Sequence, residues 1–199
     1  MNERLKKQFD FILEADKEKK IERQTYLSDS SRHENDAEHA WHMALMAILL
    51  SEHANEKIDV LKTVTMILFH DIVEIDAGDT YCYDPSAGAT QKERENAAAE
   101  RLYRLLPEDQ GRKMKALWEE FEERRTPEAK FARTMDNIQP LMLNNATEGR
   151  SWKEHSVHIG QIMERNKRTG EGSEAIWKYA YDNFIKPNLE NGSIKVDGN

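Results

Sequence analysis

The chain has 199 residues, of which 38% are hydrophobic and 33% are charged, and its formal net charge is −8. This length fits one domain with a buried core, and the negative charge argues against nonspecific binding to DNA or to an anionic membrane surface. Nine glycines and five prolines are few for a fold rich in turns, so the composition favours helices.

The N-terminal residues MNERLKKQFD contain no apolar segment typical of a signal peptide. The longest apolar run, at residues 43–50, is too short to cross a bilayer. Cys82 is the one cysteine, so no intramolecular disulfide can form, which suits a reducing compartment. We therefore expect a cytoplasmic protein without membrane segments.

Hydrophobic residues recur with helical spacing along most of the chain. The first such stripe consists of Leu5, Phe9, Ile12 and Leu13. Residues 37–53 predict an apolar helix with Asp36 as its N-cap. Residues 60–75 predict a helix that is apolar almost all round and is therefore central. Residues 78–90 contain Gly, Pro, Asp and Ser and predict a loop.

The second half of the chain continues the helical pattern. Further helices are predicted at residues 91–106, 107–123 and 174–184. Thr126, Pro127 and Glu128 have the chemistry of a helix start, with an N-cap, a first-position proline and a first-turn acid. We expect Pro140 to bend or interrupt the helix that follows.

These elements predict an all-α fold of about seven or more helices. No repeat, low-complexity segment or linker divides the chain. We therefore expect a compact single-domain helical bundle that spans residues 1–190, with a frayed tail at residues 191–199.

A charged segment, FHDIVEIDAGD, ends the apolar helix predicted at residues 60–75. His70 and Asp71 are neighbours that can converge on one point, and Glu74 lies one turn on, on the same helix face. Imidazole and carboxylate groups are ordinary ligands of divalent metals. The second carboxylate is placed to orient or deprotonate a water molecule. The alternative interpretation is a solvated helix end.

Two distant residues favour the metal site over a solvated helix end. His39 lies in the first turn of the apolar helix at 37–53, where a lone histidine is more often structural. Asp136 lies on a helical stripe with apolar neighbours, and a buried aspartate needs a partner such as a metal ion. The set suits one divalent ion such as Mn, Co, Fe, Zn or Ni. Its members are His39, His70, Asp71 and Asp136.

The motifs RHENDAEH, HDIVEIDAGD, KERE and EAKFARTMD contain these residues. Their order, H…HD…D, resembles that of the HD-domain metal-dependent phosphohydrolases, and the flanking residues resemble the 5′-deoxynucleotidase-like branch. The resemblance covers roughly residues 9–145. It implies a helical bundle of the HD-domain type, with a metal-site core at about residues 30–145, and it implies a homodimer.

The resemblance also implies roles for single residues. One divalent metal ion would be ligated by His39, His70, Asp71 and Asp136. Glu74 would activate the attacking water, and Asp79 would contact the substrate or a water beside it. Arg32 and Arg23 would lie on the substrate side and supply positive charge that the acidic chain otherwise lacks. Gln24 departs from the pattern, because the family carries an aromatic residue after the first arginine, so sugar selectivity stays open.

We expect a metal-dependent phosphohydrolase that converts (deoxy)nucleoside 5′-monophosphates to nucleoside and phosphate. Its partner would be a small phosphorylated substrate and not a nucleic acid. Three alternatives stay open. They are a phosphodiesterase or triphosphohydrolase with the same ligands, a di-iron oxygenase, and a non-catalytic nucleotide-binding regulatory module. The oxygenase needs additional histidines, and intact Glu74 and Asp79 argue against the regulatory module.

The remaining candidate residues receive a structural interpretation. Residues expected to be structural or exposed are His33, His42, His53, Cys82, Asp84 and Glu93. His155 and His158 form a second i,i+3 pair, for which packing or a subunit contact is favoured over a second metal site.

Overall fold

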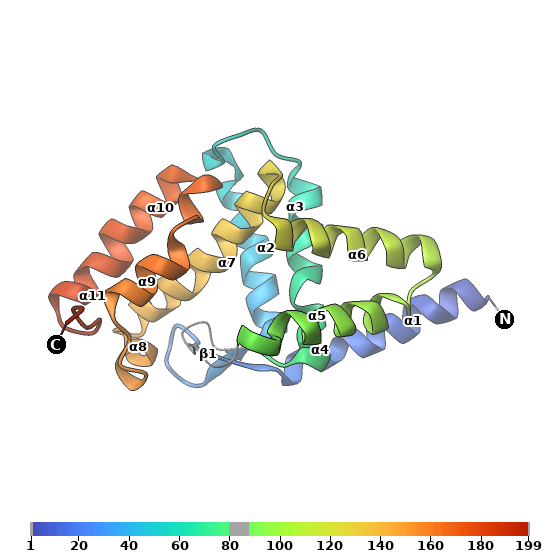
Figure 1. Cartoon of the computed structure of the whole chain (residues 1–199), viewed down its shortest axis with the longest axis horizontal. Coiled ribbons are helices and arrows are strands. Elements are labelled where there is room, and N and C mark those ends of the chain that lie inside the picture. The colour runs from blue at the N-terminus through green and yellow to red at the C-terminus, as the bar shows by residue number, and fades with distance from the viewer. Residues whose placement is uncertain (1, 80–87, 199) are drawn as a thin grey trace.

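The computed structural model describes residues 2–79 and 88–198, and it confirms the all-α single domain (Figure 1). Its α-helices are α1 (Glu3–Ala15), α2 (Asp36–Leu50), α3 (Val60–His70), α4 (Glu74–Ala77), α5 (Gly88–Tyr103), α6 (Glu108–Glu123), α7 (Pro127–Ala146), α8 (Arg150–Glu154), α9 (Ile159–Asn166), α10 (Glu174–Ala180) and α11 (Lys186–Glu190). Within the described ranges, no helix is long and apolar enough to cross a bilayer.

Short 3-10 turns, a π-helical turn and two strands connect these helices. The 3-10 turns are Asp16–Lys20, Ser51–His53, Asp71–Val73 and Thr169–Glu171, and the π-helical turn is Tyr181–Ile185. The strands are β1 (Glu22–Tyr26) and β2 (His33–Asn35), which pair antiparallel.

Helix α7 runs through the centre of the molecule and packs against α2, α3 and α6 (Figure 1). Its start is as predicted, since Thr126 Oγ1 accepts from the backbone N–H of Ala129 at 3.3 Å and Pro127 follows the cap. The helix continues through Pro140, so of the two predicted effects the interruption is wrong and the bend stays a prediction. The proline costs one backbone hydrogen bond, and the buried faces of its neighbours Ile138 and Leu141 hold the helix together.

The N-cap of α2 is Asn35, and the prediction of Asp36 was wrong. Asn35 Oδ1 accepts from the Glu38 backbone N–H at 3.0 Å, and the Glu38 carboxylate accepts from the Asn35 backbone N–H at 3.1 Å. This reciprocal capping box satisfies two N–H groups at the helix end. Asp36 is the first helical residue instead, and its side chain is fully buried.

The helix predicted at residues 60–75 is divided in the structure. Helix α3 ends at His70, a 3-10 turn covers Asp71–Val73, and α4 begins at Glu74. Nor is α3 central, because Leu61 is 77% exposed and Leu68 is 43% exposed. One side of α3 packs on the core, and the other side is open.

Apolar periodicity did not indicate which side of α1 is buried. The predicted stripe of Leu5, Phe9, Ile12 and Leu13 is exposed, and Phe11 is the residue of α1 that is buried. Phe11 stacks on Phe69, with ring centroids 5.9 Å apart. The stripe thus lies opposite the side by which α1 attaches.

The strands were not predicted, because ERQTY and HEN are polar and short. Pairing of Glu22 with Asn35 and of Tyr26 with His33 folds the chain back on itself. The hairpin therefore brings Arg23 beside Asp36, the first residue of α2.

Several helix boundaries differ from the predicted ones; for example, α2 ends at Leu50 and α5 ends at Tyr103. Helix α5 begins at Gly88, inside the predicted loop at 78–90, and the predicted last helix at 174–184 continues through the π-helical turn into α11.

The C-terminal segment is docked, and the prediction of a frayed tail at 191–199 is corrected for its described part. Ile194 is 1% exposed. The Lys195 backbone N–H donates to Val157 O, and Ile159 N–H donates to Lys195 O, each at 2.9 Å. Burial of one isoleucine and a short bridge hold the tail on α9.

Candidate metal centre and active-site pocket

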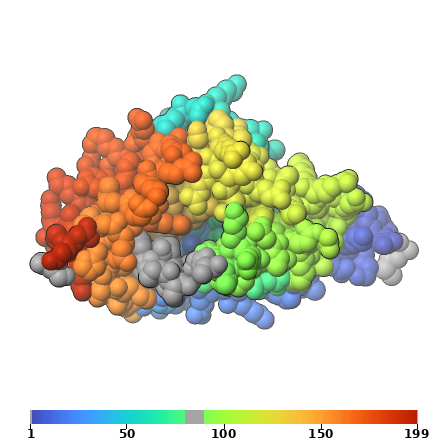
Figure 2. Space-filling view, in the orientation of Figure 1, coloured from blue at the N-terminus to red at the C-terminus, as the bar shows by residue number. Residues whose placement is uncertain are grey.

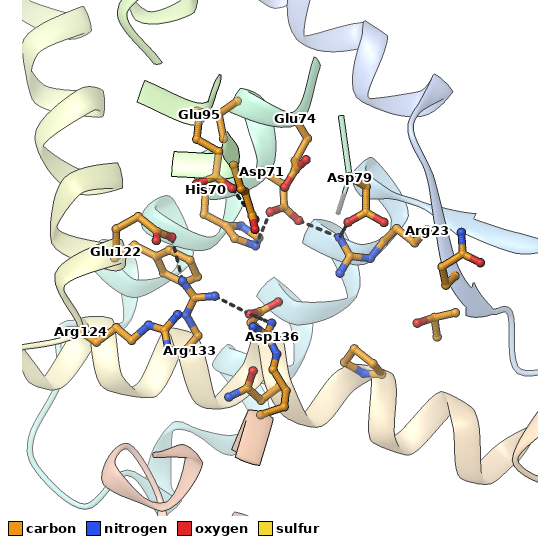
Figure 3. Close-up of a pocket in the computed structure, with 18 of the residues that line it drawn as sticks. Arg23, His70, Asp71, Glu74, Asp79, Glu95, Glu122, Arg124, Arg133 and Asp136 are labelled. Atoms are coloured by element: carbon orange, nitrogen blue, oxygen red, sulfur yellow. Dashed lines mark hydrogen bonds and ion pairs between the residues drawn. The ribbon is translucent and has the colours of Figure 1, made fainter. Parts of the chain in front are cut away.

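A cavity of about 810 Å³ opens beside α7. Figure 2 shows it as a hollow in the face of the molecule, bordered by α5 and α7. Figure 3 shows that side chains from β1, α3, α4, α5, α6 and α7 surround it. Of the predicted site residues, those that line it are Arg23, His70, Asp71, Glu74, Asp79 and Asp136.

His70 presents one ring nitrogen to the site. Its Nδ1 lies 2.6 Å from the carbonyl oxygen of Ile67, and because a carbonyl only accepts, this nitrogen carries the proton. In the neutral ring that a metal ligand requires, Nε2 then carries no proton, and it lies 3.0 Å from Asp71 Oδ1. Nε2 has no hydrogen-bond partner of good geometry. In this form two lone pairs face each other, and a cation between them would satisfy both.

His39 is oriented in the same way from α2. Its Nδ1 lies 3.0 Å from Gln139 Oε1, and its Nε2 lies 3.2 Å from Asp136 Oδ1. The amide of Gln139 is fixed, since its Nε2 donates to Glu34 Oε2 at 2.8 Å. Anchoring of one ring nitrogen while the other faces the site is the usual arrangement of metal-ligating histidines.

Among the described residues, His39, His70 and Asp136 form a potential metal site. One ligand atom from each lies within 4.8 Å of the others, and all three residues are buried. Two imidazoles and a carboxylate suit a divalent transition metal, and the unpartnered His70 Nε2 shows that the residues fit such an ion. Asp71 follows His70 in the chain, and its Oδ1 lies 3.0 Å from His70 Nε2. Its role as a fourth ligand stays a prediction.

The pKa shifts follow from the burial of many charges together. Burial and Arg23 lower the pKa of His39, but the Asp136 and Glu34 carboxylates outweigh them and raise it to about 9. Burial favours the neutral form of Asp136, yet its bond to His39 and the charge of Arg133 hold its pKa well below the usual range. The cluster therefore contains ionised carboxylates ready for a cation.

Asp136 connects the metal centre to a group of arginines (Figure 3). Its Oδ1 faces His39, whereas its Oδ2 lies 2.9 Å from Arg133 Nη1 and 3.5 Å from Arg165 Nη2. Arg124 lines the same cavity. Burial and repulsion from Arg133 and Arg165 lower the pKa of Arg124 to about 10. We name Arg124, Arg133 and Arg165 the cation wall.

Sequence reasoning missed the cation wall. Arg133 precedes Asp136 by one helical turn, and this spacing was visible in the motif EAKFARTMD. Arg124 reaches the cavity from the C-terminal end of α6, and Arg165 reaches it from α9. No local sequence pattern connects either residue to this motif.

Arg23 lies among carboxylates of the site. Its Nη1 is 3.0 Å from Asp36 Oδ1, 3.2 Å from Asp71 Oδ2 and 3.9 Å from Asp79 Oδ1. Its side chain is 14% exposed. The guanidinium therefore compensates a buried group of acids and also borders the cavity.

Glu74 and Asp79 are brought to the cavity edge. Burial raises the pKa of Glu74 to about 10, and Asp71, Asp79 and Asp36 add to the shift. Its Oε2 has no hydrogen-bond partner. Burial also raises the pKa of Asp79, although Arg23 opposes the shift. A bound cation reverses this balance by favouring the carboxylate forms.

Arg32 is not brought to the site. Its side chain is 54% exposed and bonds Glu38 at 2.5 Å, and it is not among the residues that line the cavity. The N-terminal turn of α2 holds Glu38 outward as part of the capping box, and Arg32 follows it.

The other candidates lie outside the three-ligand group. His42 Nδ1 lies 3.3 Å from Gln139 Nε2, on the same amide that contacts His39. His33 packs on Tyr26, Glu93 is exposed, and His158 Nδ1 lies 3.2 Å from Val196 O. Cys82 and Asp84 lie outside the described residues.

Comparisons with known proteins agree with this geometry. The profile of the HD domain matches residues 15–177. The chain is 33% identical over 110 residues to the 5′-deoxynucleotidase HDDC2 of Bos taurus, covering 55% of this chain and 52% of that protein. It is 30% identical over 111 residues to the Homo sapiens protein, covering 56% and 53%. The chain thus spans about half the length of the curated relatives it matches.

A crystal structure of a predicted metal-dependent phosphohydrolase from Magnetospirillum magnetotacticum is similar over nearly the whole chain. The two are 46% identical, each is covered to 96%, and the TM-score is 0.92. The profile match, the relatives and the buried His39, His70 and Asp136 together show that the chain belongs to the HD-domain family of metal-dependent phosphohydrolases.

Proposed function

We propose that the protein hydrolyses nucleoside 5′-monophosphates, with deoxynucleotides preferred, to nucleoside and phosphate. The observation that carries the proposal is the position of Asp136, with one oxygen toward the metal centre and the other toward Arg133 and Arg165. Metal ligands and cations therefore meet at one point, as a transferred phosphoryl group requires.

The metal ion would be held by His39, His70, Asp71 and Asp136. When bound, a divalent ion supplies Lewis-acid polarisation of a phosphoryl oxygen and lowers the pKa of water. The ring orientations set by Gln139 and Ile67 keep both Nε2 atoms toward that point. The donor set accepts Mn, Co, Fe, Zn or Ni and does not choose among them.

Glu74 is placed to take the proton of the attacking water. It lines the cavity next to Asp71, and its Oε2 is left without a partner by the protein. A carboxylate in that place orients the water and accepts its proton at Oε2. Asp79, held near Arg23 at 3.9 Å, is placed to contact the substrate or a water beside it.

The cation wall would bind the phosphate oxygens. Arg133 is held by Glu122 at 2.8 Å and Asp136 at 2.9 Å, so its guanidinium is pre-oriented at the cavity. The like charges of Arg124 and Arg165 border the same space. An anion relieves that repulsion, and charge-assisted hydrogen bonds from fixed guanidinium groups stabilise it. Arg23 would mainly compensate the negative charges of Asp36, Asp71 and Asp79 and not bind the phosphate.

The choice of a nucleotide rests on two supports. The cavity of about 810 Å³ is within the range of small-molecule sites and is far larger than a phosphate group needs. The HDDC2 relatives bear the name 5′-deoxynucleotidase. Gln24 lines the cavity beside Arg23, and its amide would contact the sugar.

The test is phosphate release from a panel of nucleoside mono-, tri- and cyclic phosphates, each with Mn, Co, Fe, Zn and Ni. We expect monophosphates to be preferred. Preference for triphosphates or cyclic nucleotides would instead indicate a triphosphohydrolase or a phosphodiesterase with the same metal-binding residues. Nucleotide binding without release would support a regulatory module, and two iron atoms per chain would support an oxygenase.

Variants separate metal binding from turnover. His70→Ala should abolish metal binding measured by calorimetry. Glu74→Gln should keep the metal and lose turnover by about 10²–10⁴-fold, as loss of a general base does. Full activity of Glu74→Gln on the preferred substrate would refute its role.

We also propose that the protein is a homodimer, and that α2 and α3 form its interface. Both helices expose large apolar residues at helical spacing, and we call this set the α2–α3 face. It consists of Trp41, Leu45, Ile48, Leu49, Leu61 and Leu68. Monomers seldom leave such contiguous apolar surface open. Two antiparallel helices packed on a second copy across a two-fold axis give a four-helix arrangement.

The molecular mass of the protein in solution tests whether a second copy covers the α2–α3 face. Trp41→Glu should yield monomers by light scattering. Tyr179→Glu is the matched control, since Tyr179 is 60% exposed and belongs to α10, not to α2 or α3. A wild-type monomer at micromolar concentration would refute the dimer. A cytoplasmic location stays a prediction, testable by cell fractionation.

A further inference from the structure

Two asparagines of α7 line the cavity with incompletely satisfied side chains. Asn137 is 7% exposed and Asn144 is 6% exposed. The side-chain oxygen of each has no hydrogen-bond partner. Buried carboxamide oxygens are normally paired, so each exception requires an explanation.

The hydrogen-bond partners show which end of each amide is the nitrogen. Asn144 Nδ2 donates to the carbonyl oxygen of Pro140 at 2.9 Å, which can only accept. Asn137 Nδ2 donates to Thr169 Oγ1 at 2.8 Å, while that hydroxyl donates to Asn166 Oδ1 at 3.0 Å. The atoms left over are therefore oxygens, and both are acceptors.

The two asparagines mark out a line along the cavity. They are seven residues apart, which places them two turns apart on one side of α7. Asn144 follows Asp136 by eight residues, or about 12 Å along the helix axis. Leu141 and Trp152 line the cavity near this distal end. A ligand that begins at the metal centre and continues along α7 therefore passes both asparagines.

We propose that Asn137 and Asn144 form an acceptor pair that binds hydrogen-bond donors on the leaving group of the substrate. The inference rests on the proposed phosphomonoester hydrolysis. It specifies a substrate class in which the leaving group is long and bears donors, as the hydroxyl and amino groups of a nucleoside do. The terminal torsion of asparagine is broad, so a small rotation turns each oxygen toward such a donor.

Asn166 provides the matched control. It is 2% exposed and also lines the cavity. However, its Oδ1 accepts from Thr169 Oγ1 and its Nδ2 donates to Ile162 O at 2.9 Å. Both ends of its amide are satisfied, so Asn166 is a structural residue by the same criterion that makes Asn144 a ligand-binding one.

The experiment compares wild type, Asn144→Leu and Asn166→Leu as full chains with Mn²⁺. It measures kcat/KM for a deoxynucleoside 5′-monophosphate and for p-nitrophenyl phosphate, whose leaving group has no donors, together with thermal unfolding. For Asn144→Leu we expect the ratio of the two kcat/KM values to fall about tenfold, as loss of one hydrogen bond implies. Its unfolding temperature should equal or exceed that of wild type, because an unpaired oxygen is removed. Asn166→Leu should unfold at a lower temperature.

Equal losses on both substrates, together with a lower unfolding temperature for Asn144→Leu, would overturn the acceptor pair. Failure of the proposed function gives a different result, in which wild type hydrolyses neither substrate. Binding of a deoxynucleoside without phosphate then tests the pair by calorimetry. At least fivefold weaker binding by Asn144→Leu than by wild type supports the pair, and equal binding refutes it.

Discussion

Gln139 Oε1 accepts a hydrogen bond from His39 Nδ1 at 3.0 Å. The same amide donates to Glu34 at 2.8 Å, so the ring of His39 is fixed by a buried chain of polar groups. We expect Gln139→Leu to weaken metal affinity by about 10–100-fold, the usual effect of removing a partner that orients a ligand. Titration calorimetry with Mn²⁺ measures it. Gln161→Leu on α9 is the control, and equal affinities of the two variants would contradict the role of Gln139.

The buried charge of Arg23 should dominate its contribution to stability. Removing it in Arg23→Met leaves Asp36 and Asp71 uncompensated, at a cost of about 3–5 kcal/mol in the metal-free protein. Urea unfolding of the double variant with Asp36→Asn should recover part of that loss. Arg112→Met removes an ion pair whose arginine is 74% exposed and should cost under about 1 kcal/mol. Equal effects of both arginine variants would refute the compensation.

Arg133 and Arg32 should differ in their effect on turnover. Arg133 contacts Asp136 and lines the cavity, whereas Arg32 contacts Glu38 in solvent. Arg133→Ala should lower kcat/KM by about 10²-fold or more, in the range found when one donor to a developing anion is lost. Arg32→Ala should change it less than twofold. Phosphate release measures both variants. A large loss of kcat/KM in Arg32→Ala would contradict this difference and show that the turn between β1 and β2 approaches the substrate.

Glu18 should make the metal-free protein less stable as the pH rises. Burial raises the pKa of Glu18 to about 8, and Asp71 and Asp36 add to it. A carboxyl with a raised folded-state pKa binds more protons when folded. Its stabilisation is therefore full below the unfolded pKa of about 4.3 and is lost as the pH rises through 8.

Glu18→Gln removes this titration. With a chelator present to remove metal, the unfolding temperature of the variant should be about 2–4 °C higher than that of wild type at pH 8.5. The difference should be smaller at pH 5. Thermal unfolding across that pH range is the measurement. A difference that grows toward acid would reverse the assigned sign.

Local spacing was sufficient to predict the part of the candidate site around His70, whereas His39 and Asp136 joined it through their apolar helices and the family resemblance. His70, Asp71 and Glu74 are close in sequence, so one turn of backbone places them together even though α3 gives way to a 3-10 turn. Arg165 reaches Asp136 from a separate helix, and no periodicity encodes that contact.

Periodicity also identifies an apolar stripe without saying what covers it. Leu13 is 74% exposed, although it belongs to a predicted stripe. The hairpin was missed for the opposite reason, because Arg23 and Glu34 occupy strands whose polar sequences gave no alternation to detect.

The order of these contacts along the chain has a consequence for synthesis on the ribosome. The cluster of His39, His70 and Asp136 is complete at Asp136, and Gln139 follows within the same helix. Arg165 is made later, in α9, which the C-terminal segment holds in place through Lys195. A nascent chain thus contains the whole proposed metal cluster before Arg165 of the cation wall is made, so in the proposed function the residues that would hold metal precede in synthesis a residue that would bind phosphate.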